Sequence, residues 1–266
     1  MSSNDYRIAV VDRTLDLFEA IANARDPVGV SDLAREIGAT KSAVFRILVN
    51  LERRGYVARD PVTSKYQLAG KLILLGQQAL ETIDLRAQAR PVLEDLHARF
   101  NETVNLGILA GSLISYVDMI ESDQGLRMAA RVGVTEHMHS TALGKAVLSF
   151  LPKDEQEDVL ARALPRRTER TLTDPALLRE EIAKIRRTGI AEDRGENEDG
   201  ARCFGAPIFN HQGRVIGAVS VSSPESRFDD DRLIQVSGAV RDAAIAITTS
   251  IGGTWPIEKD CQICAS

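Results

Sequence analysis

The segment from residue 31 to residue 55 constrains the fold most strongly, because it encodes two short helices separated by a tight turn. In SDLAREIG, apolar residues at helical spacing precede Gly38, the residue type that most easily ends a helix in a left-handed conformation. Thr40 can cap the next stretch, KSAVFRILVNLERRG, whose apolar residues recur every three or four positions. Two short helices joined in this way predict a helix-turn-helix.

Further elements flank this motif. Two strand-like runs at 56–58 and 66–68 are separated by the turn-forming sequence RDPVTSK, which predicts a wing. A helix over 9–24 comes before the motif. Its expected apolar face consists of Val11, Leu15, Phe18 and either Ile21 or Ala22. Residues 1–68 are therefore predicted to form a winged helix-turn-helix DNA-binding domain.

Charge is unevenly distributed along the chain. Between Arg35 and Lys71 there are eight basic and three acidic residues, a net charge of +5, although the 266-residue chain carries −5. The other residues therefore sum to −10. A basic segment in an acidic protein is typical of a small nucleic-acid-binding module joined to a second domain.

The second helix of the motif carries side chains suited to reading a DNA groove. Its apolar residues face the core, so an arginine and an aromatic lie on the opposite side, where they can contact guanine and a thymine methyl group. The candidate DNA-binding residues are Lys41, Ser42, Phe45 and Arg46 on this helix and Thr63, Ser64 and Lys65 in the wing. The alternative is a helical hairpin with a solvated basic face, which the combination of hairpin, wing and basic segment disfavours.

The pattern changes in the second part of the chain. A helix over 69–84 is expected to link the two domains. Residues 85–251 contain strand-like runs paired around turns, with helices before and after, which predicts an α+β domain on an antiparallel sheet. A loose tail is expected over 252–266.

Composition narrows the class of protein. The chain is 44% hydrophobic and 27% charged, as in an ordinary soluble globular protein. Its apolar runs are shorter than a membrane helix requires, and its first residues lack the apolar core of a secretory signal, so we expect a cytoplasmic protein without a membrane partner. Three cysteines are too few for a disulfide framework, and Cys261 and Cys264 in the tail lack further ligands at zinc spacing.

Cys203, in ARCFGAPIF, raises an alternative function. A thiol-dependent hydrolase would use Cys203 with a histidine and Asp193, and the N-terminal module would only anchor the chain to DNA. The spacing selects no histidine as the base, whether His137, His139 or His211. A free cysteine is more often a small buried apolar residue than a nucleophile, so we predict no catalytic residue. We also predict no metal site and no cofactor.

The same cysteine has a second interpretation as part of a pocket. Alternation along a strand places Cys203 on one sheet face with neighbours from GAVSVSS, in which Ser220 and Ser222 alternate with apolar residues. Two hydroxyls and a thiol on an otherwise apolar face would make a small pocket that orients a small polar ligand.

Several motifs together resemble one family. The segment VSDLAREIGATKSAVFRILVNLERRGYVARDPVTSKYQLAGKL is similar to the winged helix-turn-helix of the IclR family of bacterial transcription regulators. MHSTALGKAVLSFL and GIAEDRGENEDGARCFGAPIFNHQGRVIGAVSVSSPESRF resemble the effector-binding domain of that family, so the likeness extends over about residues 8–248. The resemblance implies a GAF-like sensor fold, a homodimer or homotetramer, and ligand-controlled binding to operator double-stranded DNA.

The resemblance also implies an effector site. It would be lined by Asp193, Cys203, Ser220 and Ser222, together with the backbone amides of Ala142 and Leu143. Free amides at a helix start favour a carboxylate, whereas Asp193 disfavours one unless the ligand also carries a hydroxyl or a hydrated carbonyl. We therefore expect the ligand to be a small organic acid. The sequence does not distinguish among hydroxy-, keto- and aromatic acids. By its resemblance to the family, the protein is expected to be a repressor rather than an activator.

Overall fold

The computed structural model describes residues 8–24, 26–82, 84–129 and 131–257. The chain divides into two compact units, Met1–Ile83 and Asp84–Ser266. In the described ranges, none of the helices combines the length and apolar character that crossing a membrane requires.

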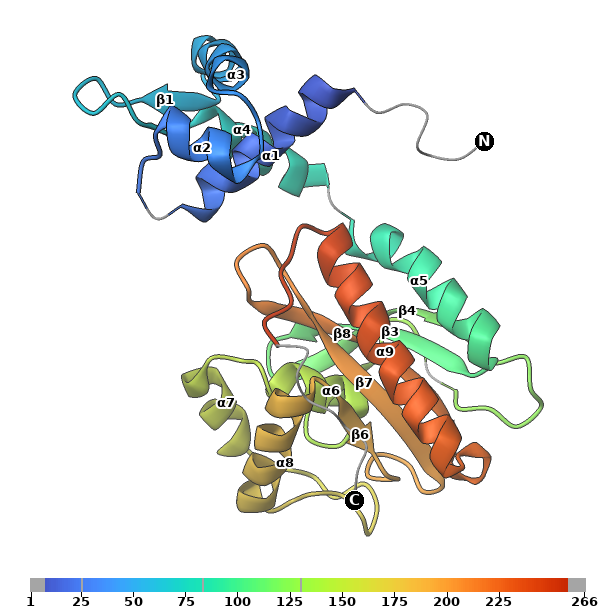
Figure 1. Ribbon diagram of the computed structural model, residues 1–266. Helices are drawn as coiled ribbons and strands as arrows, with labels where there is room; N and C mark the ends of the chain where they lie inside the picture. The colour runs from blue at the N-terminus through green and yellow to red at the C-terminus, as the bar shows by residue number, and fades with distance from the viewer. Residues whose placement is uncertain (1–7, 25, 83, 130, 258–266) are drawn as a thin grey trace. The chain divides into compact units, whose positions relative to one another are not determined.

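The first unit is a winged helix-turn-helix (Figure 1). Three helices precede a two-stranded antiparallel wing, and a fourth helix follows it. The elements are α1 (Ala9–Asn23), α2 (Val30–Glu36), α3 (Lys41–Arg53), β1 (Val57–Arg59), β2 (Tyr66–Leu68) and α4 (Lys71–Thr82). The predicted fold class of this part of the chain is confirmed.

Turn residues explain where these helices begin and end. Gly38 and Gly55 follow α2 and α3 with φ values of +64° and +77°, a region that favours glycine. Thr40 caps α3, because its Oγ1 accepts a hydrogen bond from the backbone N–H of Ala43 at 3.3 Å. The core beneath is continuous from α1 to β2. It includes Leu17, Leu33, Val44, Leu48, Val57 and Tyr66.

The apolar face predicted for α1 is wrong in its N-terminal half. Leu17, Ala20 and Ile21 are buried, whereas the side chains of Val11 and Leu15 are 49% and 53% exposed. Periodicity identifies an apolar stripe on a helix, but it does not say how much of that stripe the rest of the chain covers.

The second unit is built on a six-stranded, fully antiparallel sheet with the order β5-β4-β3-β8-β7-β6 (Figure 1). The strands are β3 (Thr103–Ala110), β4 (Leu113–Ile120), β5 (Thr135–His137), β6 (Ala191–Asp193), β7 (Ala201–Phe209) and β8 (Val215–Pro224). Because β3 and β8 pair, a strand from the start of the domain lies in the middle of the sheet beside one from its end.

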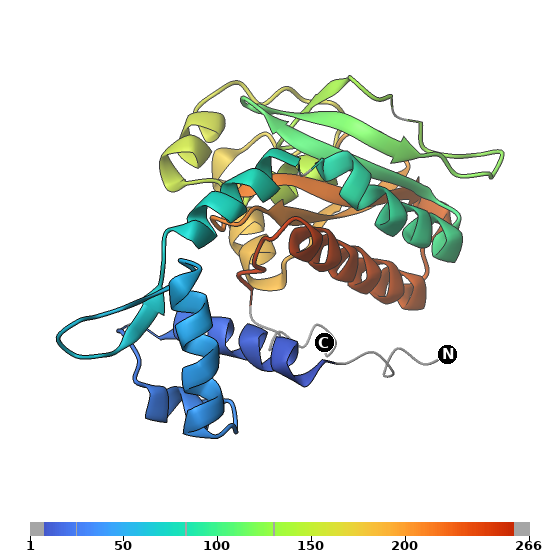
Figure 2. The same cartoon turned by 90° about the horizontal axis from the view of Figure 1, so that it is seen from above.

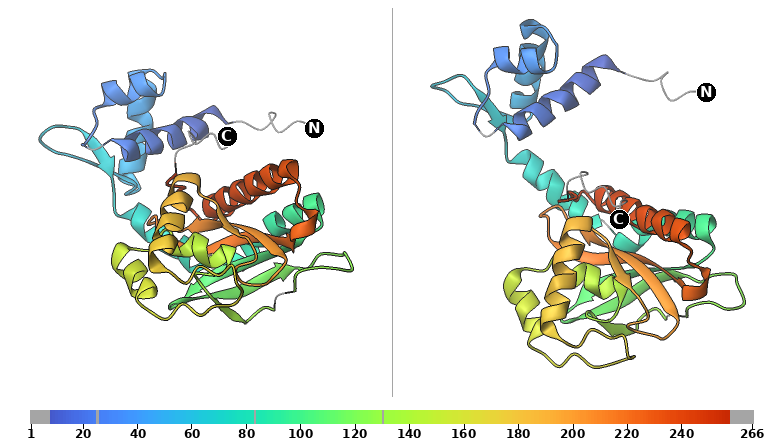
Figure 3. Two further views of the ribbon diagram at one scale, coloured as in Figure 1. Left: turned by 90° about the horizontal axis from the view of Figure 1, so that it is seen from below. Right: turned by 60° about the horizontal axis from the view of Figure 1, so that its bottom comes forward.

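Helices cover both faces of this sheet. In Figure 2, α5 (Leu85–Phe100) and α9 (Asp230–Ser250) lie together on one face. The start of α6 (Ala142–Leu148) packs on the other face, with α8 (Pro175–Thr188) beyond it. Figure 3 shows α7 (Lys153–Leu160) beside α8, where Arg179 and Glu157 form an ion pair of 2.6 Å. A 3₁₀ turn, η1 (Glu225–Arg227), precedes α9. The predicted α+β domain on an antiparallel sheet is confirmed.

The prediction of a loose tail from residue 252 is wrong for residues 252–257. The Trp255 ring packs edge-on against Phe209, with 5.5 Å between ring centroids, and Gly253 N–H donates to the carbonyl of Thr248 at 2.8 Å. A single tryptophan in a polar segment carries enough apolar area to dock it. Cys261 and Cys264 lie outside the described residues.

Candidate functional site

A small cavity between the sheet and the start of α6 brings the predicted pocket residues together. Its volume is about 60 Å³. All six predicted effector-site residues line it: Ala142, Leu143, Asp193, Cys203, Ser220 and Ser222.

Sheet register places the side chains of three strands on one wall. Cys203 of β7 is paired with Asp193 on β6 and with Ser222 on β8. Residues directly opposite in an antiparallel pair point to the same face, so carboxyl, thiol and hydroxyl groups face the cavity from adjacent strands.

Gly205 lets the second wall approach the sheet. A Cβ atom at this position would lie 2.7 Å from the carbonyl group of Ala142 and 3.1 Å from the nitrogen of Leu143. Only glycine therefore allows the first residues of α6 to pack directly on β7. In the part of the chain that the structure describes, the backbone N–H groups of Ala142 and Leu143 have no hydrogen-bond acceptor, whereas Gly144 N–H donates to Thr141 Oγ1 at 2.9 Å.

Asp193 is the buried carboxyl group of the cavity wall, and it is 2% exposed. Burial raises the pKa of Asp193 to about 7, against the opposing effect of a backbone hydrogen bond from Glu196. That bond, from Glu196 N–H to Asp193 Oδ1, is 2.7 Å long. The carboxyl group therefore changes charge close to neutral pH.

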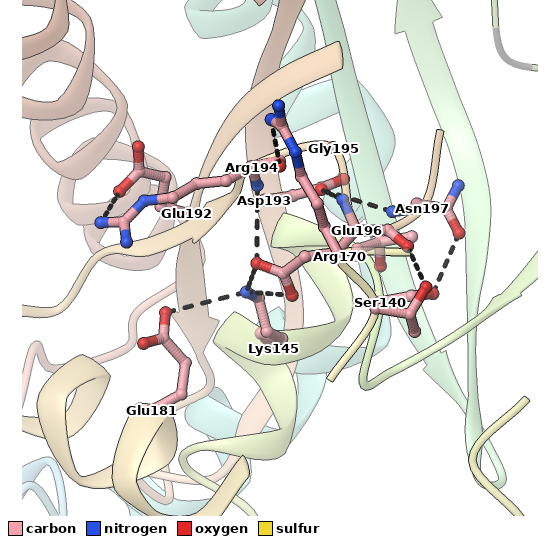
Figure 4. Close-up of polar contacts among 12 residues, drawn as sticks. Ser140, Lys145, Arg170, Glu181, Glu192, Asp193, Arg194, Gly195, Glu196 and Asn197 are labelled. Atoms are coloured by element: carbon pink, nitrogen blue, oxygen red, sulfur yellow. Dashed lines mark hydrogen bonds and ion pairs between the residues drawn. The ribbon is translucent and has the colours of Figure 1, made fainter. Parts of the chain in front are cut away.

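A buried ion pair fixes the loop after Asp193 (Figure 4). Lys145 of α6 is fully buried, and its Nζ lies 2.6 Å from both carboxylate oxygens of Glu196 and 3.7 Å from Glu181. On the same loop, Asn197 Oδ1 accepts a hydrogen bond from Ser140 Oγ at 2.9 Å. The loop is thus tied to α6 through Lys145 and to the segment just before α6 through Ser140, which fixes the wall that it contributes to the cavity.

The environment of Cys203 does not suit a nucleophile. The thiol is buried, and burial raises its pKa, which disfavours the reactive thiolate. His139 Nε2 lies 3.0 Å from the carbonyl oxygen of Pro165, and His211 is exposed in a turn. Among the described residues, none of His137, His139 and His211 is hydrogen-bonded to Cys203.

The structure also shows cavity residues that sequence reasoning missed. Five polar ones are Thr103, Asn105, Thr141, Asn197 and Glu198. Thr103 and Asn105 had a detectable signal, because they are polar residues two apart in an otherwise apolar strand. Asn197 and Glu198 had none, since their position depends on the fold of a loop.

On the first unit, α3 presents the predicted DNA-contacting side chains to solvent. Lys41, Ser42 and Arg46 are exposed, and the Phe45 side chain is 46% exposed. Val44, Leu48 and Leu51 are buried on the opposite face, as predicted.

The wing carries its three predicted residues at an exposed tip. Thr63, Ser64 and Lys65 are all exposed. Thr63 also shapes the turn, because its hydroxyl donates to Asp60 Oδ1 at 2.9 Å. That carboxylate accepts two backbone N–H groups as well, from Val62 and Thr63.

A basic recess adjoins the exposed face of α3. It has a volume of about 570 Å³, and α1 and α3 both line it. Arg46 lies on its edge with Arg53 and Arg54, and Arg13 enters from α1. Arg13 lies outside the basic segment recognised in the sequence, so only the packing of α1 on the motif reveals it.

Comparison with known families decides the assignment. Residues 10–61 match the IclR helix-turn-helix domain, and residues 77–249 match the domain described as the bacterial transcriptional regulator IclR C-terminal. The chain belongs to the IclR family. Members of this family are transcriptional regulators that bind operator DNA and small-molecule effectors.

Individual relatives cover almost the whole chain. The transcriptional repressor IclR of Escherichia coli is 31% identical over 244 residues, which is 91% of this chain and 89% of that protein. An IclR transcriptional regulator from Silicibacter sp. TM1040 has a solved structure with a TM-score of 0.86 and 31% identity, covering 94% and 98% of the two chains. An IclR homologue from Microbacterium hydrocarbonoxydans, solved with 4-hydroxybenzoate, has a TM-score of 0.58 and 26% identity, covering 91% and 98%.

Proposed function

We propose that this protein is a ligand-responsive repressor that binds operator DNA through α3 and the wing, and a small organic acid in the cavity beside α6. One observation carries the proposal: a single cavity collects two serine hydroxyls, a thiol, a titrating carboxyl group and two free backbone amides. The effector-site residues are Ala142, Leu143, Asp193, Cys203, Ser220 and Ser222.

The size of the cavity narrows the class of acid. A single water needs about 10–15 Å³ of such space, so a cavity of about 60 Å³ has room for a small organic acid. We favour a small aliphatic hydroxy- or keto-acid for this protein over an acid as large as the 4-hydroxybenzoate of the Microbacterium homologue.

Electrostatics favours an acid that also has a hydroxyl or a carbonyl group. The free amides of Ala142 and Leu143 can donate hydrogen bonds to a ligand carboxylate, and so can the serine hydroxyl groups of the cavity. Asp193 opposes a second negative charge unless it is protonated. The acid would then bind with its carboxylate toward α6 and its second oxygen toward the sheet.

DNA binding would involve more than one copy of the chain. The exposed side chains of Val11 and Leu15 form an apolar stripe on α1, which supports a homodimer or homotetramer. Two copies of α3 related by a twofold axis would read an operator with two half-sites. Repression is supported by the relationship to the transcriptional repressor IclR of E. coli.

The alternative function, a thiol-dependent hydrolase, has weaker support. Its nucleophile would be a buried thiol with a raised pKa, and among the described residues His137, His139 and His211 are not hydrogen-bonded to it. We therefore assign Cys203 to the wall of the ligand cavity and no catalytic role.

DNA binding tests the proposal directly. The full chain is titrated onto the DNA upstream of its own gene, and Arg46→Ala is compared with Arg99→Ala, a control that removes an exposed arginine from α5. If Arg46 makes a two-hydrogen-bond contact to guanine, its loss costs about 1–3 kcal/mol of specific binding. The control should leave the affinity within twofold. Equal affinity for wild type and Arg46→Ala at fixed salt would contradict the assigned role of α3.

A further inference from the structure

The basic recess beside α3 gathers positive charge that the described fold does not neutralise. Four exposed arginines line it: Arg13 of α1, Arg46 and Arg53 of α3, and Arg54 directly after α3. The described residues that line the recess include neither aspartate nor glutamate. In the part of the chain that the structure describes, these four arginines form no ion pair, whereas Arg35 on α2 lies 2.7 Å from Asp32. Because like charges repel, the arrangement favours an anionic partner.

Helix α1 carries its basic and acidic residues on different sides. Val10, Arg13 and Thr14 line the recess, at the spacing of three and four residues that places side chains on one helix face. The acidic residues of this helix are exposed and are not among those that line the recess: Asp12, Asp16 and Glu19. The one basic side chain of α1 is therefore directed to the recess without an acidic neighbour there.

The position of the recess indicates which anion it fits. Ala43, Ile47, Asn50 and Arg54 line it, so it follows one side of α3. An α-helix with its side chains is about 10–12 Å across and the DNA major groove is about 12 Å wide, so an inserted helix has a phosphate backbone on either side. If the exposed face of α3 reads bases, the recess therefore lies against the phosphates of one strand.

Hydrogen bonds along α3 leave Arg53 able to donate. Asn50 Nδ2 donates to the carbonyl of Arg46 at 2.8 Å, and Asn50 Oδ1 accepts from Arg53 Nη2 at 3.3 Å. The guanidinium group of Arg53 has five N–H donors, so others remain for a ligand. Guanidinium groups match phosphate oxygens with two parallel hydrogen bonds. Since Arg13 enters the same recess from α1, a phosphate there would be contacted from two helices.

We propose that this recess binds a backbone phosphate of the operator, and that Arg13 makes α1 part of the DNA interface. This inference rests on the proposed function, because it adds a contact surface to α3 and the wing. Arg46 reads a base, whereas Arg13, with Arg53 and Arg54, holds the strand beside it. Every DNA sequence has the same phosphates, so the contact adds affinity without adding sequence selectivity.

Titrations of the full chain on the DNA upstream of its own gene and on a random duplex of equal length separate the two kinds of contact. Arg13→Ala should weaken both complexes by a similar factor, roughly three- to tenfold. It should also reduce the slope of log affinity against log salt concentration by about one, the loss of one phosphate contact. Arg46→Ala should weaken mainly the operator complex. Arg13→Lys keeps the charge and should keep the slope.

A control and a mapping experiment exclude indirect effects. Arg99→Ala removes an exposed arginine from α5 and should change neither affinity nor slope. Arg13 is exposed, so Arg13→Ala should keep the melting temperature of the wild type. Ethylation interference then locates the contact: one operator phosphate whose ethylation weakens binding of the wild type should have no effect on Arg13→Ala.

The outcomes distinguish this inference from the proposed function. Unchanged affinity and slope in Arg13→Ala would overturn the phosphate site and leave the role of α3 standing. A loss confined to the operator would also overturn it, because Arg13 would then contact a base, and so would an equal loss in Arg99→Ala. If the wild type binds the operator no more tightly than the random duplex, operator recognition fails, while the random duplex still tests the recess.

Discussion

At the scale of single residues, Asp193 makes the charge of the cavity depend on the pH of the solution. Its pKa is about 7 because the carboxyl group is buried. The backbone hydrogen bond from Glu196 and the charge of Lys145 lower that pKa, and the negative charge of the Glu196 side chain raises it. A raised pKa means that the neutral carboxyl group is favoured below about pH 7 and the carboxylate above it. An anionic ligand meets less repulsion from the neutral form.

Ligand affinity should therefore increase as the pH falls. We expect a small acid to bind about tenfold more tightly at pH 6 than at pH 8, because an organic acid stays ionised over this range while Asp193 gains a proton. Calorimetric titration at several pH values measures the effect. Asp193→Asn keeps the side-chain shape without a titrating group and should show a flat profile. Tighter binding of the wild type at pH 8 would contradict this account.

Two adjacent serines on β8 provide a matched test of the cavity wall. Ser222 lines the cavity, whereas Ser223, its neighbour, hydrogen-bonds to the carbonyl of Pro224 and is absent from the cavity lining. Ser222→Ala removes a donor to the ligand carboxylate and should weaken binding by about 1–2 kcal/mol. Ser223→Ala should leave affinity unchanged. Equal effects of the two variants in a calorimetric titration would argue against the assigned ligand position.

At the scale of elements, the cavity exists because α6 packs directly on β7 at Gly205. Gly205→Ala places a methyl group within 2.7 Å of the Ala142 carbonyl group, so the start of α6 has to move. We expect destabilisation of about 1–3 kcal/mol and loss of ligand binding. Thermal unfolding and ligand titration measure both effects.

Gly238→Ala, on α9, is the control, because a Cβ there meets nothing within 4 Å. Unimpaired ligand binding by Gly205→Ala would mean that the free amides of α6 do not form part of the site.

Helical and strand periodicity was sufficient to predict most elements, but not which surfaces are covered. Helix α3 was predicted with its buried face, because its caps and its apolar spacing agree. The exposed half of α1 was predicted as core, since an apolar stripe looks the same whether or not the chain covers it. The docking of Trp255 on Phe209 joins segments far apart in sequence, and local patterns carry no information on such contacts.

The strand residues of the candidate site were predictable from the sequence, whereas the position of the loop after Asp193 was not. Alternation along β7 and β8 places Cys203 and Ser222 on one face, and the resemblance to the IclR family supplied Asp193 and the α6 amides. A lysine in a helix is normally exposed, so the burial of Lys145 could not be foreseen. Its partner Glu196 is 51 residues away, and only the folded loop brings the two together.

At the scale of the whole molecule, the chain combines two compact units with different surfaces. The first carries exposed basic side chains on α3 and in the wing, and the second contains a small polar cavity. In a ligand-responsive repressor, the acid has to bind the DNA-competent and DNA-incompetent states with different affinities. Coupling between the two sites is then reciprocal: each ligand changes the affinity for the other by the same factor.

This reciprocity offers the most direct test of the account. DNA affinity is measured with and without a saturating small hydroxy- or keto-acid, such as lactate or pyruvate, and the affinity for that acid is measured with and without saturating operator DNA. We predict that the two ratios are equal and differ from one by roughly 5- to 150-fold, the usual range for allosteric coupling. If the acid binds the cavity and the protein binds its operator, yet both ratios equal one, the protein is not a ligand-responsive regulator of that operator.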